Sequence, residues 1–177
     1  MQLPERIETA RLVLRRPLVS DAESIFENYA QDPEVTRYLV WRPHASVTET
    51  RAFRERADEG WTSGTDLTWA LTLPPSESVI GMISLRPHGH HADIGYVLAR
   101  RWWNQGFMTE AGRAIVQAAF LDPALFRLWA LCDVENPGSA RVLGKLGMVL
   151  EGTLRRRVVH PNISPEPRDS LLYALVR

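Results

Sequence analysis

The chain has 177 residues, 45% hydrophobic and 24% charged, and its 21 basic and 21 acidic residues cancel to a formal net charge of zero. This size and composition predict one globular domain over residues 1–177 that buries its own core. The lack of net positive charge argues against nucleic-acid binding, and no apolar run approaches the roughly 20 residues that cross a bilayer. One cysteine, Cys132, and an N-terminus without a signal-peptide core predict a cytoplasmic protein without disulfides.

The first half of the chain is predicted to contain a short strand, two helices and a hairpin. The strand is expected at Leu12–Leu14. Ser20–Glu23 and Ser46–Glu49 both match the capping box, in which a Ser starts a helix and a Glu three residues later returns a hydrogen bond. Pro33 ends or interrupts the first helix, and Gly60 is expected to close the second. Two β-rich runs follow as a hairpin at residues 68–73 and 79–85.

The second half is predicted to alternate strands and helices. Small and apolar side chains recur at helical spacing from about Thr109 to Leu121. Another helix begins at Asn136-Pro137, an N-cap residue followed by a first-turn proline, and ends at Gly147. Strands are expected at residues 90–99, 127–134 and 170–176, with an additional candidate at 149–154. This order predicts a mixed α/β (or α+β) sheet with helices on both faces.

The most informative stretch is the run from Asp93 to Leu98 together with the segment from Arg101 to Ala111. A predicted strand ends in a short loop that contains Gly106, and the loop opens directly into an amphipathic helix. Backbone N–H groups at a helix start have no intrahelical partner and lie at the positive end of the helix dipole. The junction is therefore suited to bind an anion such as a diphosphate. Neither a GxxxxGKS/T nor a GxGxxG motif is present, which argues against nucleotide hydrolysis and dinucleotide binding.

Four segments carry a resemblance to a known family: residues 9–15 with 21–23, residues 93–111, residues 136–152 and residues 169–173. In this order and spacing they resemble the GNAT superfamily of N-acetyltransferases, and within it the RimJ/RimL-like branch of ribosomal-protein acetyltransferases. The resemblance covers nearly the whole chain. It implies the GNAT fold, a central twisted sheet in which two neighbouring strands part just after residues 93–99 and hold coenzyme A in the cleft between them. It also implies transfer of an acetyl group from acetyl-CoA to a primary amine, by direct attack on the thioester.

The superfamily's diphosphate loop has the form Q/R-x-x-G-x-G/A. Trp103, Gly106 and Met108 occupy its defining positions, so only the central glycine is kept, although tryptophan in the first place is usual for the RimJ/RimL-like branch. Such a loop binds phosphate through backbone N–H groups, so the departures matter little. The resemblance implies cofactor contacts from Val97, Leu98, Trp103, Asn104, Gln105, Gly106, Phe107, Met108, Thr109, Asn136, Arg141 and Lys145. Arg100 and Arg101 are further candidates for the 3′-phosphate, with an ordinary exposed position as the alternative.

A primary amine is mostly protonated at neutral pH, so the implied reaction needs a base. Asp93 is the preferred base, directly or through water, because several family members place a catalytic glutamate there; the alternative is a strand-end carboxylate that faces solvent or pairs with an arginine. The resemblance makes Ser139 the candidate acid for the leaving thiolate and Tyr173 a second candidate catalytic residue. Asn136 and Ser139 also suit a helix start on structural grounds alone.

The acceptor site is expected in the loops at residues 38–43 and 88–91, with Tyr38, Trp41 and His88 as candidate substrate contacts. The acceptor is a protein N-terminal α-amine or a small-molecule amine. Residues 88–91 contain three histidines, but no Cys or carboxylate cluster with ligand spacing accompanies them, so we expect no metal site. No nucleic-acid or membrane partner is expected, and the protein is a monomer or a homodimer. A competing hypothesis is a CoA-binding sensor or interaction module without turnover.

The six tryptophans are expected to divide between the core and the ligand cleft. Trp69 and Trp129 lie in predicted strands and are assigned to the core, as is Cys132. The other four lie near loops and are assigned to the cleft: Trp41, Trp61, Trp102 and Trp103.

Overall fold

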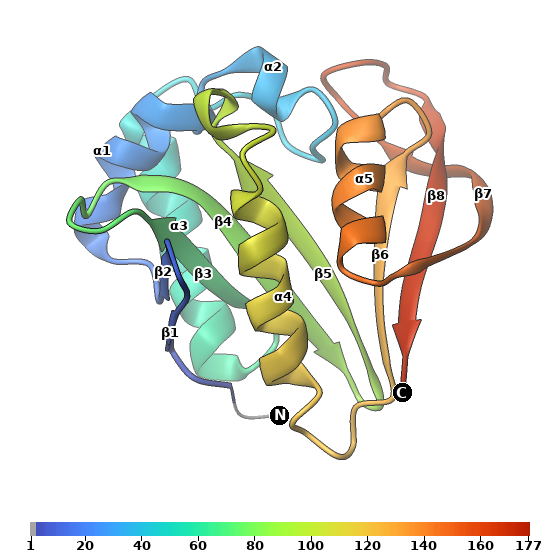
Figure 1. Cartoon of the computed structure of the whole chain (residues 1–177). Coiled ribbons are helices and arrows are strands. Elements are labelled where there is room, and N and C mark those ends of the chain that lie inside the picture. The colour runs from blue at the N-terminus through green and yellow to red at the C-terminus, as the bar shows by residue number, and fades with distance from the viewer. Residues whose placement is uncertain (1–2) are drawn as a thin grey trace.

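The computed structural model describes residues 3–177, and its centre is one eight-stranded sheet (Figure 1). The strands are β1 (Arg6–Glu8), β2 (Val13–Arg15), β3 (Leu67–Thr72), β4 (Val79–His88), β5 (His91–Leu98), β6 (Arg127–Asp133), β7 (Val149–Val159) and β8 (Pro167–Val176). They lie side by side in the order β1-β2-β3-β4-β5-β6-β8-β7. Every neighbouring pair is antiparallel except β5 and β6, which run parallel. The predicted mixed sheet is confirmed.

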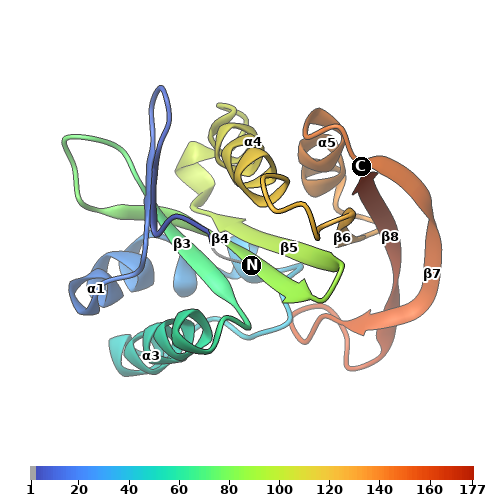
Figure 2. The ribbon, with the colours of Figure 1, turned by 90° about the horizontal axis from the view of Figure 1, so that it is seen from below.

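Helices cover both faces of this sheet. They are α1 (Ala22–Ile25), α2 (Pro33–Thr36), α3 (Val47–Ser63), α4 (Phe107–Ala119) and α5 (Pro137–Lys145), and a π-helical turn at Phe26–Ala30 continues α1. Figure 2 shows α4 and α5 on one face, called the α4 face below, and α1 and α3 on the other, called the α3 face. Within residues 3–177, no helix is long and apolar enough to cross a membrane.

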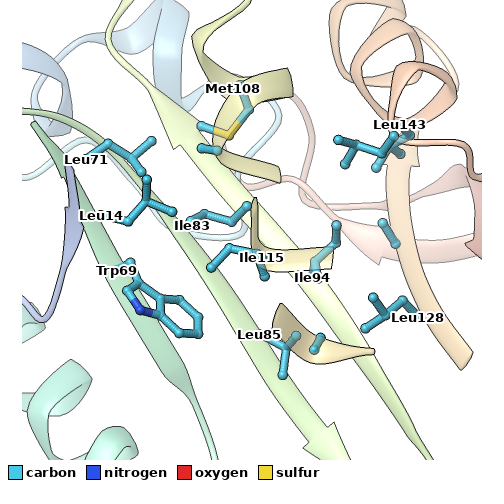
Figure 3. Close-up of a cluster of buried hydrophobic side chains, with 14 of the residues drawn as sticks. Leu14, Trp69, Leu71, Ile83, Leu85, Ile94, Met108, Ile115, Leu128 and Leu143 are labelled. Carbon is cyan, nitrogen blue, oxygen red and sulfur yellow. The ribbon is translucent and has the colours of Figure 1, made fainter. Parts of the chain in front are cut away.

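The hydrophobic core lies mainly between the sheet and α4. Met108 and Ile115 of α4 point onto Ile83 of β4 and Ile94 of β5, and all four side chains are buried (Figure 3). Burying an aliphatic side chain of this size contributes about 1.5–3 kcal/mol. A second buried cluster covers the α3 face and consists of Ile25, Tyr29, Ala30, Val35, Ala70, Val79, Met82 and Ala99. Because strand residues alternate between the faces, successive positions of β5 reach different environments.

Several helix ends differ from the sequence prediction. Gly60 lies inside α3, which ends at Ser63 with Gly64 in the left-handed conformation (φ 70°). The missing side chain of Gly60 instead allows close approach, because an added Cβ would lie 2.7 Å from the carbonyl oxygen of Asp66. Helix α4 begins at Phe107, two residues before the predicted start.

Neither predicted serine caps its helix with its side chain. The Asp21 carboxylate accepts from the Leu18 N–H at 2.7 Å, so the helical segment begins before Ser20. At α3, Glu49 returns its bond to the Ala45 N–H at 2.9 Å, while the Ser46 side chain makes no capping bond. The candidate strand at 149–154 is confirmed and extends to Val159, and β1 was not predicted.

The predicted opening between two strands is present. The parallel pairing of β5 with β6 consists of His91 with Arg127, Ala92 with Leu128, and Asp93 with Trp129. Beyond Asp93 the two strands diverge, as Figure 1 shows, and β5 continues to Leu98 without a strand partner on that side. Unpaired N–H and C=O groups on a strand edge can form hydrogen bonds with an extended ligand, in the same way as they would with another strand.

Candidate active site in the opened sheet

A cavity of about 1080 Å³ occupies the opening between β5 and β6 and is lined from both faces of the sheet. Most of the site residues predicted from the sequence line it. These are Tyr38, Trp41, Asp93, Val97, Leu98, Trp103, Asn104, Gly106, Phe107, Met108, Thr109, Asn136, Ser139, Arg141 and Lys145. Three predicted residues are not among the lining residues: His88, Gln105 and Tyr173.

On the α4 face, the cavity ends at the N-terminus of α4. Gly106 is the N-cap with φ 82°, and Asn104 also has a positive φ of 59°. The first helical bond runs from the Glu110 N–H to the Gly106 carbonyl at 2.9 Å. Within residues 3–177, the backbone N–H groups of residues 104–109 donate to no protein acceptor. The structure therefore contains the row of free donors that an anion needs.

The loop before α4 is held by its aromatic side chains. The Trp103 indole N–H donates to the Leu98 carbonyl at 2.7 Å. The Trp102 ring packs edge-to-face on Phe107, with ring centroids 5.6 Å apart. The Gln105 side chain is turned away and donates to the Arg101 carbonyl at 2.8 Å, so only its backbone is available to a ligand. These contacts fix the loop without using its free N–H groups.

Ser139 lies in the first turn of α5 and contacts β5 across the opening. Its N–H donates to Asn136 Oδ1 at 3.1 Å, so Asn136 caps the helix as predicted. Its hydroxyl lies 2.8 Å from the Tyr96 hydroxyl, which sequence analysis did not select. Burial raises the pKa of Tyr96, more than its hydrogen bond to Ser139 lowers it, so the phenol stays protonated. The two hydroxyls form a neutral proton-donating pair on the cavity wall.

Cys132 of β6 lies beside this pair. Burial raises the pKa of the Cys132 thiol to about 11, although a hydrogen bond to Ser139 acts in the opposite direction. The thiol is buried, as predicted, yet it also lines the cavity. It is therefore a protonated group next to Ser139 at neutral pH.

Asp93 lies where β5 and β6 separate, and the residue is buried, with 8% of its surface exposed. Arg86 donates to Oδ2 through Nε at 2.9 Å and also through Nη2. His88 Nε2 lies 2.8 Å from Oδ1. The carboxylate thus lines the cavity and also pairs with an arginine, so both alternatives considered from the sequence have a structural counterpart. His88 contacts Asp93 but is not among the residues that line the cavity.

Aromatic side chains line the α3-face part of the cavity. The Tyr38 hydroxyl donates to the Glu135 carbonyl at 2.8 Å, and the Trp41 ring lies 5.0 Å from that of His44. Trp129 also lines the cavity and is only half-buried, so its assignment to the core was wrong. It alternates with core residues along β6 and faces the opening. Trp61, assigned to the cleft, instead packs on Trp69 with ring centroids 4.9 Å apart.

The profile of the acetyltransferase (GNAT) domain matches residues 11–149 of the chain. The chain belongs to the GNAT acetyltransferase family. The uncharacterized N-acetyltransferase p20 of Bacillus licheniformis is 30% identical to it over 154 residues, which cover 85% of this chain and 86% of p20. This GNAT protein is therefore an N-acetyltransferase, and the predicted superfamily is confirmed.

Solved structures agree with the fold of this GNAT enzyme. A GNAT acetyltransferase from Bacillus anthracis matches with a TM-score of 0.84 at 27% identity, covering 97% of this chain and 98% of that one. RimL, a ribosomal L7/L12 α-N-protein acetyltransferase, matches with a TM-score of 0.86 at 21% identity, covering 97% and 98%. The RimJ/RimL-like resemblance thus extends to the three-dimensional fold.

A charged cluster that sequence analysis missed closes the α3-face part of the GNAT cavity. Arg168 Nε donates to the buried Asp133 carboxylate at 2.7 Å, and His160 Nε2 lies 3.5 Å from the same carboxylate. Burial raises the pKa of Asp133, but hydrogen bonds from Arg168 and the Glu135 N–H lower it further, so the net pKa is below its usual value. No sequence motif marks this cluster, because its members come from β6, β8 and the end of β7.

Two of the basic candidates for the 3′-phosphate and one predicted catalytic residue do not line the cavity. Arg100 contacts Asp32 at 3.4 Å and Arg101 donates to Asn28 at 2.9 Å. Tyr173 packs against the core of the α4 face and does not line the cavity. In the part of the chain that the structure describes, no group of three or more His, Cys, Asp or Glu is arranged to hold a metal ion.

Proposed function

We propose that this GNAT enzyme transfers the acetyl group of acetyl-CoA directly to a primary amine. One observation carries the proposal: a single cavity through the opened sheet joins the free N–H groups of α4 on one face to Asp93 on the other. Donor and acceptor then approach from opposite faces and meet between β5 and β6. RimL has been solved with coenzyme A and the microcin C7 immunity acetyltransferase MccE with acetyl-CoA and AMP, on the same fold.

The donor half uses backbone groups. The N–H groups of residues 104–109 bind the diphosphate, and the free edge of β5 at Val97 and Leu98 binds the pantetheine arm. Arg141 and Lys145 line the same cavity and serve the 3′-phosphate. Asn136 uses Oδ1 to cap α5, which leaves its amide NH₂ group for the cofactor.

Acetyl-CoA supplies an activated acyl thioester. Asp93 first accepts the proton of the ammonium group, directly or through water, so that the neutral nitrogen can attack the acyl carbon. The second N–H proton leaves to water as the amide forms. Arg86 and His88 contact the two oxygens of the Asp93 carboxylate and hold it in position at the cavity. As the carbon–sulfur bond breaks, the hydroxyl pair of Ser139 and Tyr96 donates a proton to the leaving thiolate.

The acceptor is a primary amine carried by a small molecule or by a protein N-terminus. Tyr38, Trp41 and Trp129 give the α3-face part of the cavity aromatic walls, and Asp93 lies at its inner end. A protonated amine is attracted to a carboxylate and to aromatic faces, so it concentrates here before it is deprotonated.

The test follows thiol release from acetyl-CoA with a panel of amines that includes peptides with free N-termini, polyamines and amino acids. We expect thiol release above the hydrolysis background with at least one amine, and CoA should raise the melting temperature. If CoA stabilises the protein but no amine releases thiol, the alternative of a CoA-binding module without turnover is favoured. The matched control is Ser139→Ala: a variant that still binds CoA but releases thiol more slowly separates the chemical step from CoA binding.

A further inference from the structure

Arg11 connects the N-terminal hairpin to the diphosphate loop, although nearly a hundred residues separate them. It follows β1 and precedes β2. Its Nη1 donates to the Gln105 carbonyl at 3.0 Å, and its Nε donates to Glu110 Oε2 at 2.7 Å. Its guanidinium carbon lies 4.3 Å from the centroid of the Phe107 ring. The side chain therefore contacts the loop, the N-cap and the first turn of α4 from outside the cavity.

The bond to the Gln105 carbonyl determines where the next N–H group points. In a planar trans peptide the carbonyl and the following N–H point in opposite directions. Because Arg11 holds the Gln105 carbonyl on the outer side, the Gly106 N–H points away from Arg11. Gly106 lines the cavity and has φ 82°, and glycine can leave this conformation more easily than other residues can. Arg11 restricts this peptide from outside the cavity.

Glu110 holds Arg11 in place. Its Oε1 accepts from the Thr9 hydroxyl at 2.7 Å and from the Arg11 N–H at 2.8 Å. Burial raises the pKa of Glu110, but the bonds from Thr9 and Arg11 lower it further, so the carboxylate is ionised at neutral pH. A carboxylate in the first turn of α4 is also favoured by the helix dipole. The network aligns the guanidinium with the loop and leaves Nη2 beside Gly106, where an added Cβ would lie 3.4 Å away.

We propose that Arg11 is a positioning residue for the diphosphate of the acyl donor: it orients the Gln105–Gly106 peptide so that its N–H faces the ligand. The inference rests on the proposed donor, acetyl-CoA. It predicts that Arg11 matters only for donors that carry a diphosphate. A purely structural role would affect all donors equally.

The test compares acetyl-CoA with S-acetylpantetheine, which has the same thioester and pantetheine arm but no diphosphate. In Arg11→Met, which keeps the stem on Phe107 but removes the donors, we expect kcat/KM with acetyl-CoA to fall about tenfold or more, mainly through KM. With S-acetylpantetheine the change should stay below about twofold. Arg11→Lys should recover only part of the loss, because an ammonium does not reproduce the guanidinium geometry. Equal losses with both donors, or no loss with acetyl-CoA, would overturn the proposal.

Arg6→Met is the matched control, because Arg6 is an exposed arginine of the same hairpin that bonds Glu8 at 2.8 Å. It should leave both donors unchanged. Calorimetric dissociation constants for CoA and for pantetheine provide a second readout that needs no turnover. If Arg11→Met and Arg11→Lys bind CoA more weakly but bind pantetheine as the wild type does, the role of Arg11 is supported even if no amine is acetylated. If both variants bind CoA and pantetheine more weakly to the same extent, that role is contradicted even if the enzyme is active.

Discussion

The Tyr96 hydroxyl lies 2.8 Å from the Ser139 hydroxyl and so connects β5 to the first turn of α5 across the opened sheet. Neither residue can reach the other through local structure, because 43 positions separate them. The contact places two neutral hydroxyls on the cavity wall next to Cys132. A departing thiolate in this opening therefore meets donors that remain protonated at neutral pH.

Ser139→Ala should lower kcat by about 10²-fold, within the range of general acid catalysis, with little change in the dissociation constant of CoA. Tyr96→Phe should have a smaller effect in the same direction, because Ser139 remains present but loses its partner. Steady-state kinetics and calorimetric CoA binding separate the two parameters. Wild-type kcat in Ser139→Ala would show that another group, or water, protonates the thiolate.

Asp93→Asn should lower kcat/KM for the amine by about 10²-fold or more at neutral pH and recover in part at high pH. The amide cannot accept a proton, but a growing fraction of the amine is already neutral as the pH rises. The control is Asp66→Asn, which removes another carboxylate near Arg86, at 3.8 Å, and should change the profile little. Activity equal to wild type at every pH would exclude Asp93 as the base.

Gly106→Ala should destabilise the protein by about 1–2 kcal/mol, because Gly106 is left-handed at φ 82° and an alanine there is strained. The KM for acetyl-CoA should rise as the loop shifts. Gly144→Ala is the control, for which the opposite sign is expected. Gly144 lies inside α5, and an added Cβ would meet no other atom within 4 Å, so alanine should stabilise the protein by about 0.5–1 kcal/mol. Urea denaturation measures the free energy of unfolding of both variants. A change of the same sign in the two variants would contradict this prediction.

Cys132 should react slowly with iodoacetamide at neutral pH, because burial raises the pKa of its thiol to about 11. Only the thiolate reacts, so the rate should increase about tenfold per pH unit until it levels off near the pKa. Bound CoA should protect the thiol, which lines the cavity. Since the chain has one cysteine, mass spectrometry of the intact protein counts the adduct directly. A rate that levels off below pH 9 would contradict the raised pKa.

Arg168→Met should destabilise the protein at neutral pH, because the buried Asp133 carboxylate loses its guanidinium partner and keeps only the Glu135 N–H and His160. In the wild type the Asp133 pKa is lowered, so its stabilisation is present above the unfolded pKa and is lost as the pH falls through the folded one. In the variant this pH dependence should be weaker, because Arg168 no longer lowers the Asp133 pKa. Adding Asp133→Asn to Arg168→Met should recover part of the loss at pH 7. Urea denaturation from pH 4 to 8 tests these signs.

The features predicted correctly depend on neighbours in sequence. The start of α5 at Asn136-Pro137 follows from one side chain and the next residue, and the loop around Gly106 that opens into α4 follows from the end of a strand and the start of a helix. The errors in the predicted helix ends are also local, because they amount to a few residues. Ser46 and Glu49 match the capping-box pattern, but only the Glu49 side chain makes a capping bond. The pattern alone does not tell which of the two side chains will form its bond.

By itself, the sequence determined the order of the elements apart from β1 and α2, because hydrophobic periodicity and helix-capping chemistry operate over a few residues. The resemblance to the GNAT family, carried by four segments of the sequence, implied most of the residues that line the cavity. Only the tertiary structure decided which side chains meet: Arg86 and His88 on Asp93, Tyr96 on Ser139, and Arg11 on the loop before α4. These contacts depend on strand register and on where β5 separates from β6. A change of register by one residue moves every side chain of a strand to the other face, and no local pattern in the sequence contains that information.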